Sequence, residues 1–234
     1  MSMPYLERHG DVFVLYLGNR DQEVDENRFH PDRLAEIGAL LDEVEAHEGP
    51  AALVTAATGK FWSNGLDTDW IFANLADLPG YLDSVHALYV RMLTFPAATV
   101  AAIQGHAFGA GAMLALTHDF AVMRADRGFW CLPEVQLGMP FTVGMSALLR
   151  TRLSSSTAVE AVTTSRRYGG SDALAAGIVA HTVDGDAVLA AAVERAAGLI
   201  STRGANLGVV KRGLHEPLVA ALETKTDESN FRFG

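Results

Sequence analysis

Apolar residues gather along this chain in blocks that predict alternating strands and helices. Three short and almost wholly apolar runs, at residues 11–17, 51–56 and 99–103, predict strands of a buried parallel sheet. Apolar residues that recur every three or four positions predict amphipathic helices at residues 34–44 and 81–93. Strands that alternate with helices in this way are typical of an α/β domain.

The second half of the chain continues the alternation but is richer in helices. The pattern predicts a buried helix over 112–116, strands over 119–123 and 128–131, helices over 143–153 and 158–163, a helix followed by a glycine stop and a strand over 173–179, and amphipathic helices over 187–200 and 209–222. No repeat or linker divides the chain, so its 234 residues, 49% of them hydrophobic, fit one large α/β domain.

Charge and cysteine content limit the possible partners. The formal net charge is −10 and the 18 basic residues are scattered, which argues against nucleic acid or an anionic membrane as a partner. No apolar run approaches the roughly 18 residues that span a bilayer. Cys131 is the single cysteine, so an internal disulfide is excluded, and we expect it in the core of a cytoplasmic protein.

The candidate chemistry lies in two segments that follow predicted strands, residues 61–67 and 105–111. The second contains three glycines and two alanines directly before the predicted buried helix. The first N–H groups of a helix have no intrahelical partner and carry partial positive charge. Small side chains let a ligand oxygen approach such groups closely, so this turn predicts an oxyanion hole.

Other glycine-rich and histidine-containing motifs fit less well. Leu114 stands where a dinucleotide fingerprint needs its third glycine, and no Lys-Ser/Thr pair follows to make a phosphate loop. Ser63 is preceded by Phe61 where the elbow of serine hydrolases has a glycine. We therefore interpret His106 and His118 as structural residues and not as members of a catalytic triad.

One acid stands inside an otherwise apolar sequence. Glu134 follows Pro133 and precedes Leu137 and Met139 in a run that is typical of buried chain. Burying a neutral polar group without a hydrogen-bond partner costs about 2 kcal/mol or more, and burying an unpaired carboxylate costs more than that. Glu134 is therefore hydrogen-bonded, raised in pKa or functional, and the structural alternative is an acid that caps the turn before Gly138.

Three motifs in this order resemble the crotonase (enoyl-CoA hydratase/isomerase) superfamily. They are Phe61-x-Ser-x-Gly65-x-Asp67, the glycine-rich turn at 105–111 with Asp119 beyond it, and Pro133-Glu134-Val-x-Leu-Gly138-x-Pro140. Within the family, the Ser-Asn-Gly-Leu-Asp segment is most similar to plant-type 3-enoyl-CoA to 2-enoyl-CoA isomerases.

The resemblance implies an architecture and an assembly. The fold would be an α/β crotonase-like spiral of repeated ββα units, with a core domain over residues 1–185. Residues 186–234 would form a C-terminal helical region for trimerisation or for covering the site. The expected assembly is a homotrimer or a hexamer made as a dimer of trimers.

The resemblance also implies roles for individual residues. Glu134 would be the catalytic base, and the backbone N–H groups of Leu66 and Ala110 would form the oxyanion hole. The acyl-CoA substrate would contact Arg20, Arg28, Ser63, Asn64, Gly65, Asp67, Gly109 and Met113. Coenzyme A is part of the substrate, so no separate cofactor and no metal is implied.

Several side chains keep two interpretations at this point. Arg20, Arg28, Lys211 and Arg212 could each meet a CoA phosphate or simply face solvent. Trp70, Ile71, Phe72, Leu75 and Leu78 could form one wall of an acyl pocket or part of the core. We expect the acyl chain length to depend on Trp62, Trp70, Phe72, Met113 and Phe141.

Position 113 distinguishes the two main reactions of the family. Hydratases hold the attacking water between two glutamates, and one of these positions is Met113 here. A methionine cannot polarise water, whereas moving a double bond needs only one group to carry a proton. The sequence therefore favours a 3-enoyl-CoA to 2-trans-enoyl-CoA isomerase acting in fatty-acid β-oxidation. The alternatives are a hydratase or another crotonase reaction such as thioester hydrolysis or decarboxylation, and a non-catalytic CoA-ligand or RNA-binding relative.

Overall fold

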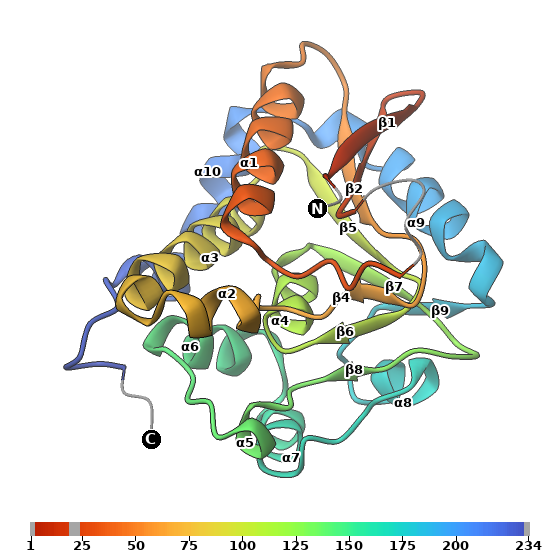
Figure 1. Ribbon diagram of the computed structural model, residues 1–234. Helices are drawn as coiled ribbons and strands as arrows, with labels where there is room; N and C mark the ends of the chain where they lie inside the picture. The colour runs from red at the N-terminus through yellow and green to blue at the C-terminus, as the bar shows by residue number, and fades with distance from the viewer. Residues whose placement is uncertain (1–2, 19–23, 232–234) are drawn as a thin grey trace.

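The computed structural model describes residues 3–18 and 24–231, which form two sheets of mainly parallel strands surrounded by helices (Figure 1). The larger sheet has the order β1-β2-β3-β5-β7-β9, with β1 antiparallel to β2 and every other neighbouring pair parallel. Its strands are β1 Tyr5–His9, β2 Val12–Tyr16, β3 Ala52–Ala56, β5 Ala98–Ile103, β7 Phe120–Arg124 and β9 His181–Val183. The smaller sheet is parallel and consists of β4 Phe61–Ser63, β6 His106–Phe108 and β8 Trp130–Cys131.

The helices follow the strands in chain order. They are α1 Pro31–Ala46, α2 Thr68–Ala73, α3 Leu78–Leu93, α4 Ala110–Thr117, α5 Glu134–Leu137, α6 Val143–Arg152, α7 Ser155–Thr164, α8 Gly170–Ala175, α9 Val188–Ala197, α10 Ala205–Leu214 and α11 Glu216–Glu223. Short 3-10 helices lie at Leu75–Asp77, Gly185–Ala187 and Ile200–Thr202.

The chain repeats one unit three times: a strand of the larger sheet, a strand of the smaller sheet, then a helix. These units are β3-β4-α2, β5-β6-α4 and β7-β8-α5. This is the predicted spiral of ββα units. Because the smaller sheet is parallel, the segments that leave β4, β6 and β8 all emerge at the same edge of it.

The central strands of the larger sheet, β2, β3 and β5, are buried on both faces. On one face, alternate residues such as Val12 and Val14 pack against Val188, Ala192 and Ala196 of α9. The opposite side chains join the main core beneath α1, α3, α4 and α6. Burial on both faces explains why these strands are continuous apolar runs. Cys131 is also buried, as predicted.

Two predicted elements differ from the structure. The predicted helix over 209–222 is two helices, α10 and α11, separated at His215. Pro217 lies in the first turn of α11, where its missing N–H costs nothing. The predicted strand at 178–179 begins only at His181, and the edge strand β1 was not predicted because it mixes polar and apolar residues.

The division at residue 185 stays a prediction. In the structure, α9 lies directly on the larger sheet, and α11 packs against α3 and α6 (Figure 1). The described helices after residue 185 therefore contribute to the same core as the strands before it.

Lys211 contradicts the interpretation of a solvated face. Its side chain is 8% exposed, and its Nζ lies 2.6 Å from Oδ2 of Asp119 and 2.8 Å from the carbonyl oxygen of Ala97. The same carboxylate oxygen accepts a hydrogen bond of 2.8 Å from the backbone N–H of Thr99. This pair joins α10 to the starts of β5 and β7. Arg212, its neighbour, is exposed and pairs with Glu223.

We expect Lys211→Met to lower the free energy of unfolding by about 3 kcal/mol, because it leaves the Asp119 carboxylate without its buried cation. Arg212→Met is the matched control and should change the free energy by less than about 1 kcal/mol, since exposed pairs contribute little. Urea unfolding at one fixed protein concentration measures both. Equal losses in the two variants would contradict the structural role of Lys211.

Candidate active site

A cavity of about 240 Å³ opens where the segments after β4, β6 and β8 meet. Its wall is largely apolar, and Glu134 is the one acidic side chain among the described residues that line it. The lining residues are Arg28, Asn64, Leu66, Thr68, Ile71, Leu78, Leu82, Phe108, Gly109, Ala110, Pro133, Glu134, Leu137, Met139, Pro140, Met145 and Phe231.

The first side of the cavity is the turn after β4. The carbonyl oxygen of Gly65 accepts a hydrogen bond of 2.8 Å from the backbone N–H of Phe29. Because the peptide bond is planar and trans, the N–H of Leu66 in the same peptide group must point away from Phe29. Gly65 has φ +80°, a conformation that favours glycine. The turn therefore presents a backbone donor at a residue that lines the cavity.

The start of α4 forms the second side. Gly109 precedes the helix with φ +53°, and its N–H donates to the carbonyl of Cys131 at 3.0 Å. Ala110 is the first helical residue, so its N–H has no acceptor within the helix. A Cβ added to Gly65 would lie 2.8 Å from this nitrogen. Glycine is thus required for the two sides to approach each other.

Gly111 makes a second close approach between the same two segments. A Cβ at this position would lie 2.5 Å from the carbonyl oxygen of Ser63, inside van der Waals contact. The Ser63 hydroxyl donates to the carbonyl of Asn27 at 2.8 Å and accepts from the N–H of Gly65 at 3.1 Å. Small residues in the turn after β6 therefore let α4 begin directly against the end of β4.

Glu134 is the first residue of α5 and lies on the third side. The residue is 9% exposed, and its Oε2 has no hydrogen-bond partner among the residues that the structure describes. A Cβ added to Gly109 would lie 3.2 Å from its Oε1, so the carboxyl group lies against this glycine. The turn before Gly138 is closed by the backbone carbonyl of Glu134 and not by its side chain.

Burial changes the acidity of this carboxyl group. Desolvation raises the pKa of Glu134 to about 7, because the charged form loses contact with water and gains no cation. A carboxyl group with a pKa near neutrality can both accept and return a proton. The cavity wall thus combines an acid whose pKa lies near neutrality with the backbone of Leu66 and Ala110.

The other residues predicted to contact substrate divide into two groups. Arg28, Asn64 and Gly109 line the cavity. Gly65 shapes the turn, Ser63 is buried behind it, and Asp67 caps α2 by accepting a hydrogen bond of 3.1 Å from the N–H of Trp70. Met113 lies in the hydrophobic core and not in the cavity wall. Arg20 lies outside the described residues.

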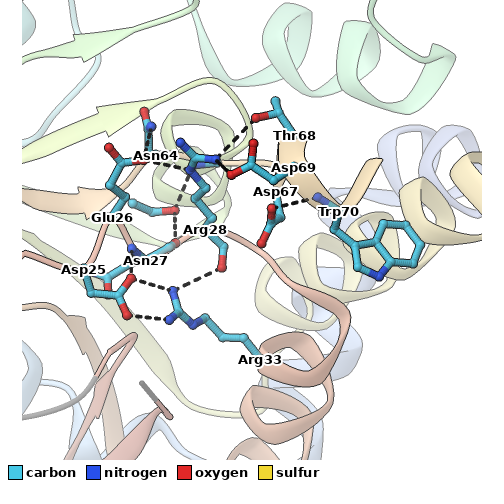
Figure 2. Close-up of polar contacts among 12 residues, drawn as sticks. Asp25, Glu26, Asn27, Arg28, Arg33, Asn64, Asp67, Thr68, Asp69 and Trp70 are labelled. Atoms are coloured by element: carbon cyan, nitrogen blue, oxygen red, sulfur yellow. Dashed lines mark hydrogen bonds and ion pairs between the residues drawn. The ribbon is translucent and has the colours of Figure 1, made fainter. Parts of the chain in front are cut away.

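Arg28 is held at the rim by two carboxylates (Figure 2). Its Nε donates to Glu26 at 2.7 Å, and one terminal nitrogen donates to Asp69 at 3.0 Å. Asn64 donates to the same Glu26 oxygen at 2.9 Å. Asp25, which precedes Arg28 in the same loop, pairs with the buried Arg33 of α1 at 2.8 Å. Arg28 is therefore positioned at the cavity with its charge already balanced.

The predicted acyl wall is only partly correct. Ile71 and Leu78 line the cavity, but Trp62 is in the core, Phe72 is 66% exposed, and neither Trp70 nor Phe141 is part of the wall. Most of the apolar wall comes from other residues, Leu82, Phe108, Leu137, Met139, Pro140, Met145 and Phe231. Met139 and Pro140 belong to the Pro-Glu motif, whereas no local pattern connects Phe231 with the cavity.

The histidines do not form a catalytic group with Glu134. Neither His106 nor His118 belongs to the cavity lining. The His118 ring is hydrogen-bonded to the carbonyl of Leu114 and the hydroxyl of Thr55, and burial lowers its pKa to about 4. Across the described residues, no three His, Cys, Asp or Glu side chains are grouped closely enough to hold a metal ion.

Comparison with known proteins assigns the family. The sequence profile of the enoyl-CoA hydratase/isomerase family matches residues 9–232. This chain belongs to that family. As a member of the enoyl-CoA hydratase/isomerase family it is an enzyme, and the family acts on acyl-CoA substrates.

Two plant members of the enoyl-CoA hydratase/isomerase family are similar in sequence. Enoyl-CoA delta isomerase 3 of Arabidopsis thaliana is 35% identical over 180 residues, and the peroxisomal enoyl-CoA delta isomerase 2 of the same plant is 36% identical over 184. Each alignment covers 74% of both chains.

A solved structure confirms the crotonase fold. It is the crystal structure of a probable enoyl-CoA hydratase from Mycobacterium tuberculosis H37Rv, which superimposes on this protein with a TM-score of 0.86. The two sequences are 22% identical, and the superposition covers 95% of this chain and 92% of the mycobacterial chain. Along the described residues, no helix is both long and apolar enough to cross a membrane.

The raised pKa of Glu134 makes stability depend on pH. The folded protein favours the protonated form, so this stabilisation is complete below pH 4.5, the ordinary pKa, and is lost as the pH rises through about 7. The shift corresponds to about 3 kcal/mol. We expect the free energy of unfolding of the wild type, relative to Glu134→Gln, to fall by about this amount between pH 4.5 and 7.5. Parallel profiles of the two proteins in urea unfolding would show that the carboxyl group is not perturbed.

Proposed function

We propose that this enzyme is a Δ3-Δ2-enoyl-CoA isomerase, which shifts the double bond of a 3-enoyl-CoA to give the 2-trans-enoyl-CoA in fatty-acid β-oxidation. The observation that carries the proposal is the single acidic side chain, Glu134, in an otherwise apolar part of the described cavity wall. The names of the two Arabidopsis relatives favour the same reaction.

The proposed reaction begins with proton removal. The ionised Glu134 takes a proton from C2 of the substrate, and the electrons of that C–H bond pass into the thioester to form an enolate. The N–H groups of Leu66 and Ala110 stabilise the enolate oxygen. Loss of one such donor typically costs about 3 to 4 kcal/mol of transition-state stabilisation.

The second half of the reaction returns the same proton. The enolate electrons form the new C2=C3 double bond, and the electrons of the old C3=C4 bond take the proton from Glu134 at C4. The carboxyl group is regenerated as a carboxylate, so one acid completes the cycle. A pKa of about 7 suits both steps, because the group must be a base in the first and an acid in the second.

A hydratase would need a second group to activate water. The residue at the position of the other hydratase glutamate, Met113, is apolar and buried in the core. Asp67 and Asp69 are the nearest acids in sequence to the oxyanion turn, but Asp67 caps α2 and Asp69 pairs with Arg28. These contacts favour isomerisation over hydration.

The proposal extends to the substrate and the assembly. Coenzyme A enters as part of the substrate, with Arg28 and Asn64 at the rim where it would lie, and no separate cofactor takes part. The enzyme acts in the cytoplasm as a homotrimer or a dimer of trimers.

The test follows the absorbance of the conjugated enoyl thioester during incubation with 3-hexenoyl-CoA and, separately, 2-hexenoyl-CoA. We expect absorbance to rise with the first substrate and stay constant with the second. Glu134→Gln should lower kcat at least about 10²-fold, because it removes the general base. Glu223→Gln, an exposed change in α11, should have no effect. The wild-type rate should fall as the pH drops through about 7, where Glu134 becomes protonated.

Other outcomes identify other reactions. Loss of absorbance from 2-hexenoyl-CoA would mean hydration and would contradict the argument from Met113. No change with either substrate would exclude the isomerase. That result would instead favour thioester hydrolysis, decarboxylation or a binding role.

A further inference from the structure

Helix α3 contacts both halves of the proposed oxyanion hole through tyrosine hydroxyls. We propose that Tyr81 and Tyr89 are positioning residues that hold the N–H groups of Leu66 and Ala110 in a fixed relative geometry. The inference rests on the proposed function, because it concerns the stabilisation of an enolate. Neither tyrosine belongs to the motifs that identify the family.

Tyr81 holds the turn that carries Leu66. Its hydroxyl accepts a hydrogen bond of 2.9 Å from the backbone N–H of Asp67 and donates one of 2.8 Å to the carbonyl of Phe29. Phe29 also donates its N–H to the carbonyl of Gly65. The residues on both sides of Leu66 are therefore tied to Phe29, one directly and one through the tyrosine. This leaves the peptide group of Leu66 little freedom to rotate.

Tyr89 holds the start of α4. Its hydroxyl donates a hydrogen bond of 2.7 Å to the carbonyl oxygen of Ala110, and the residue is fully buried. Its bond therefore fixes the first residue of the helix, the residue that supplies the second donor. Burial raises the pKa of Tyr89, and the charge of Glu134 adds to this effect.

One rigid helix links the two tyrosines. They are eight residues apart in α3, which corresponds to a rise of about 12 Å. Burial raises the pKa of both phenols, so each hydroxyl keeps its proton across the working pH range. Donors that are fixed in advance stabilise developing charge without a reorganisation cost during the reaction. The separation of the two N–H groups is thus set by α3.

Buried tyrosines usually have a hydrogen-bond partner, so partners alone would not indicate a role. Tyr168 provides the contrast within this chain. It is also buried, but its hydroxyl donates to the carboxylate of Glu160 on α7, and the residue is outside the cavity lining. Removing the Tyr168 hydroxyl also breaks a side-chain hydrogen bond, but one that contacts neither the oxyanion turn nor α4.

The experiment compares Tyr81→Phe, Tyr89→Phe and the control Tyr168→Phe in the full-length protein. We expect each of the first two changes to lower kcat with 3-hexenoyl-CoA about 10-fold, with KM within about 2-fold. This loss is smaller than the 10² to 10³-fold that typically follows removal of an oxyanion donor. Tyr168→Phe should leave kcat unchanged even if its thermal stability falls.

A second measurement does not depend on turnover. Acetoacetyl-CoA can bind as an enolate, which has its own ultraviolet absorbance, whereas butanoyl-CoA cannot enolise as readily and reports only on binding of the thioester. Tyr81→Phe and Tyr89→Phe should each weaken binding of the acetoacetyl-CoA enolate about 10-fold and leave the affinity for butanoyl-CoA unchanged. A purely structural role would lower both affinities together or neither.

The outcomes separate this inference from the proposed function. A wild type that isomerises 3-hexenoyl-CoA, with unchanged kcat and enolate binding in both tyrosine variants, would overturn the inference alone. A wild type without isomerase activity would overturn the proposed function, and the enolate assay would still test the tyrosines. If one variant does not fold, the other decides the result, because each tyrosine holds a different donor.

Discussion

The site depends on the close contact between the turn after β4 and the first residue of α4. Both segments follow strands of the smaller sheet, and parallel pairing brings them to the same edge. Side chains would keep them apart, since Cβ atoms at Gly65 and Gly111 would overlap backbone atoms of the opposite segment. Glycine at these positions therefore allows Leu66 and Ala110 to line one cavity.

The same packing decides the chemistry of Glu134. The carboxyl group lies against Gly109, and Arg28, the cation of the described cavity wall, is paired with Glu26 and Asp69. Burial therefore raises the pKa of Glu134 to about 7. A charged partner there would have lowered the pKa and made the group a poorer proton carrier. The apolar wall thus shapes the cavity and also raises the pKa of Glu134.

The rest of the fold keeps these parts in place. The larger sheet, covered by α9 on one face and by the main core on the other, supplies the strands that deliver each turn to the site. Helix α3 adds hydrogen bonds to both oxyanion segments, and the buried pair of Lys211 and Asp119 joins α10 to the strands β5 and β7. Contacts between distant segments therefore hold the turn after β4 and the start of α4 against the rest of the core.

Local patterns in the sequence were enough to predict the central strands of the larger sheet, the buried helix α4 and the segments around Gly65, Gly109 and Glu134. Those features depend on residue type and spacing, which the sequence contains directly. Contacts between distant segments were not predictable in this way. The sequence indicated that Lys211 is solvated, whereas in the structure it is buried and pairs with Asp119. Phe231 lines the cavity, and Met113 lies in the core instead. The helix at 209–222 was also divided by Pro217. Sequence determined which segments could carry the chemistry, whereas tertiary packing decided which side chains surround them, because burial and partner choice arise only when distant parts of the chain meet.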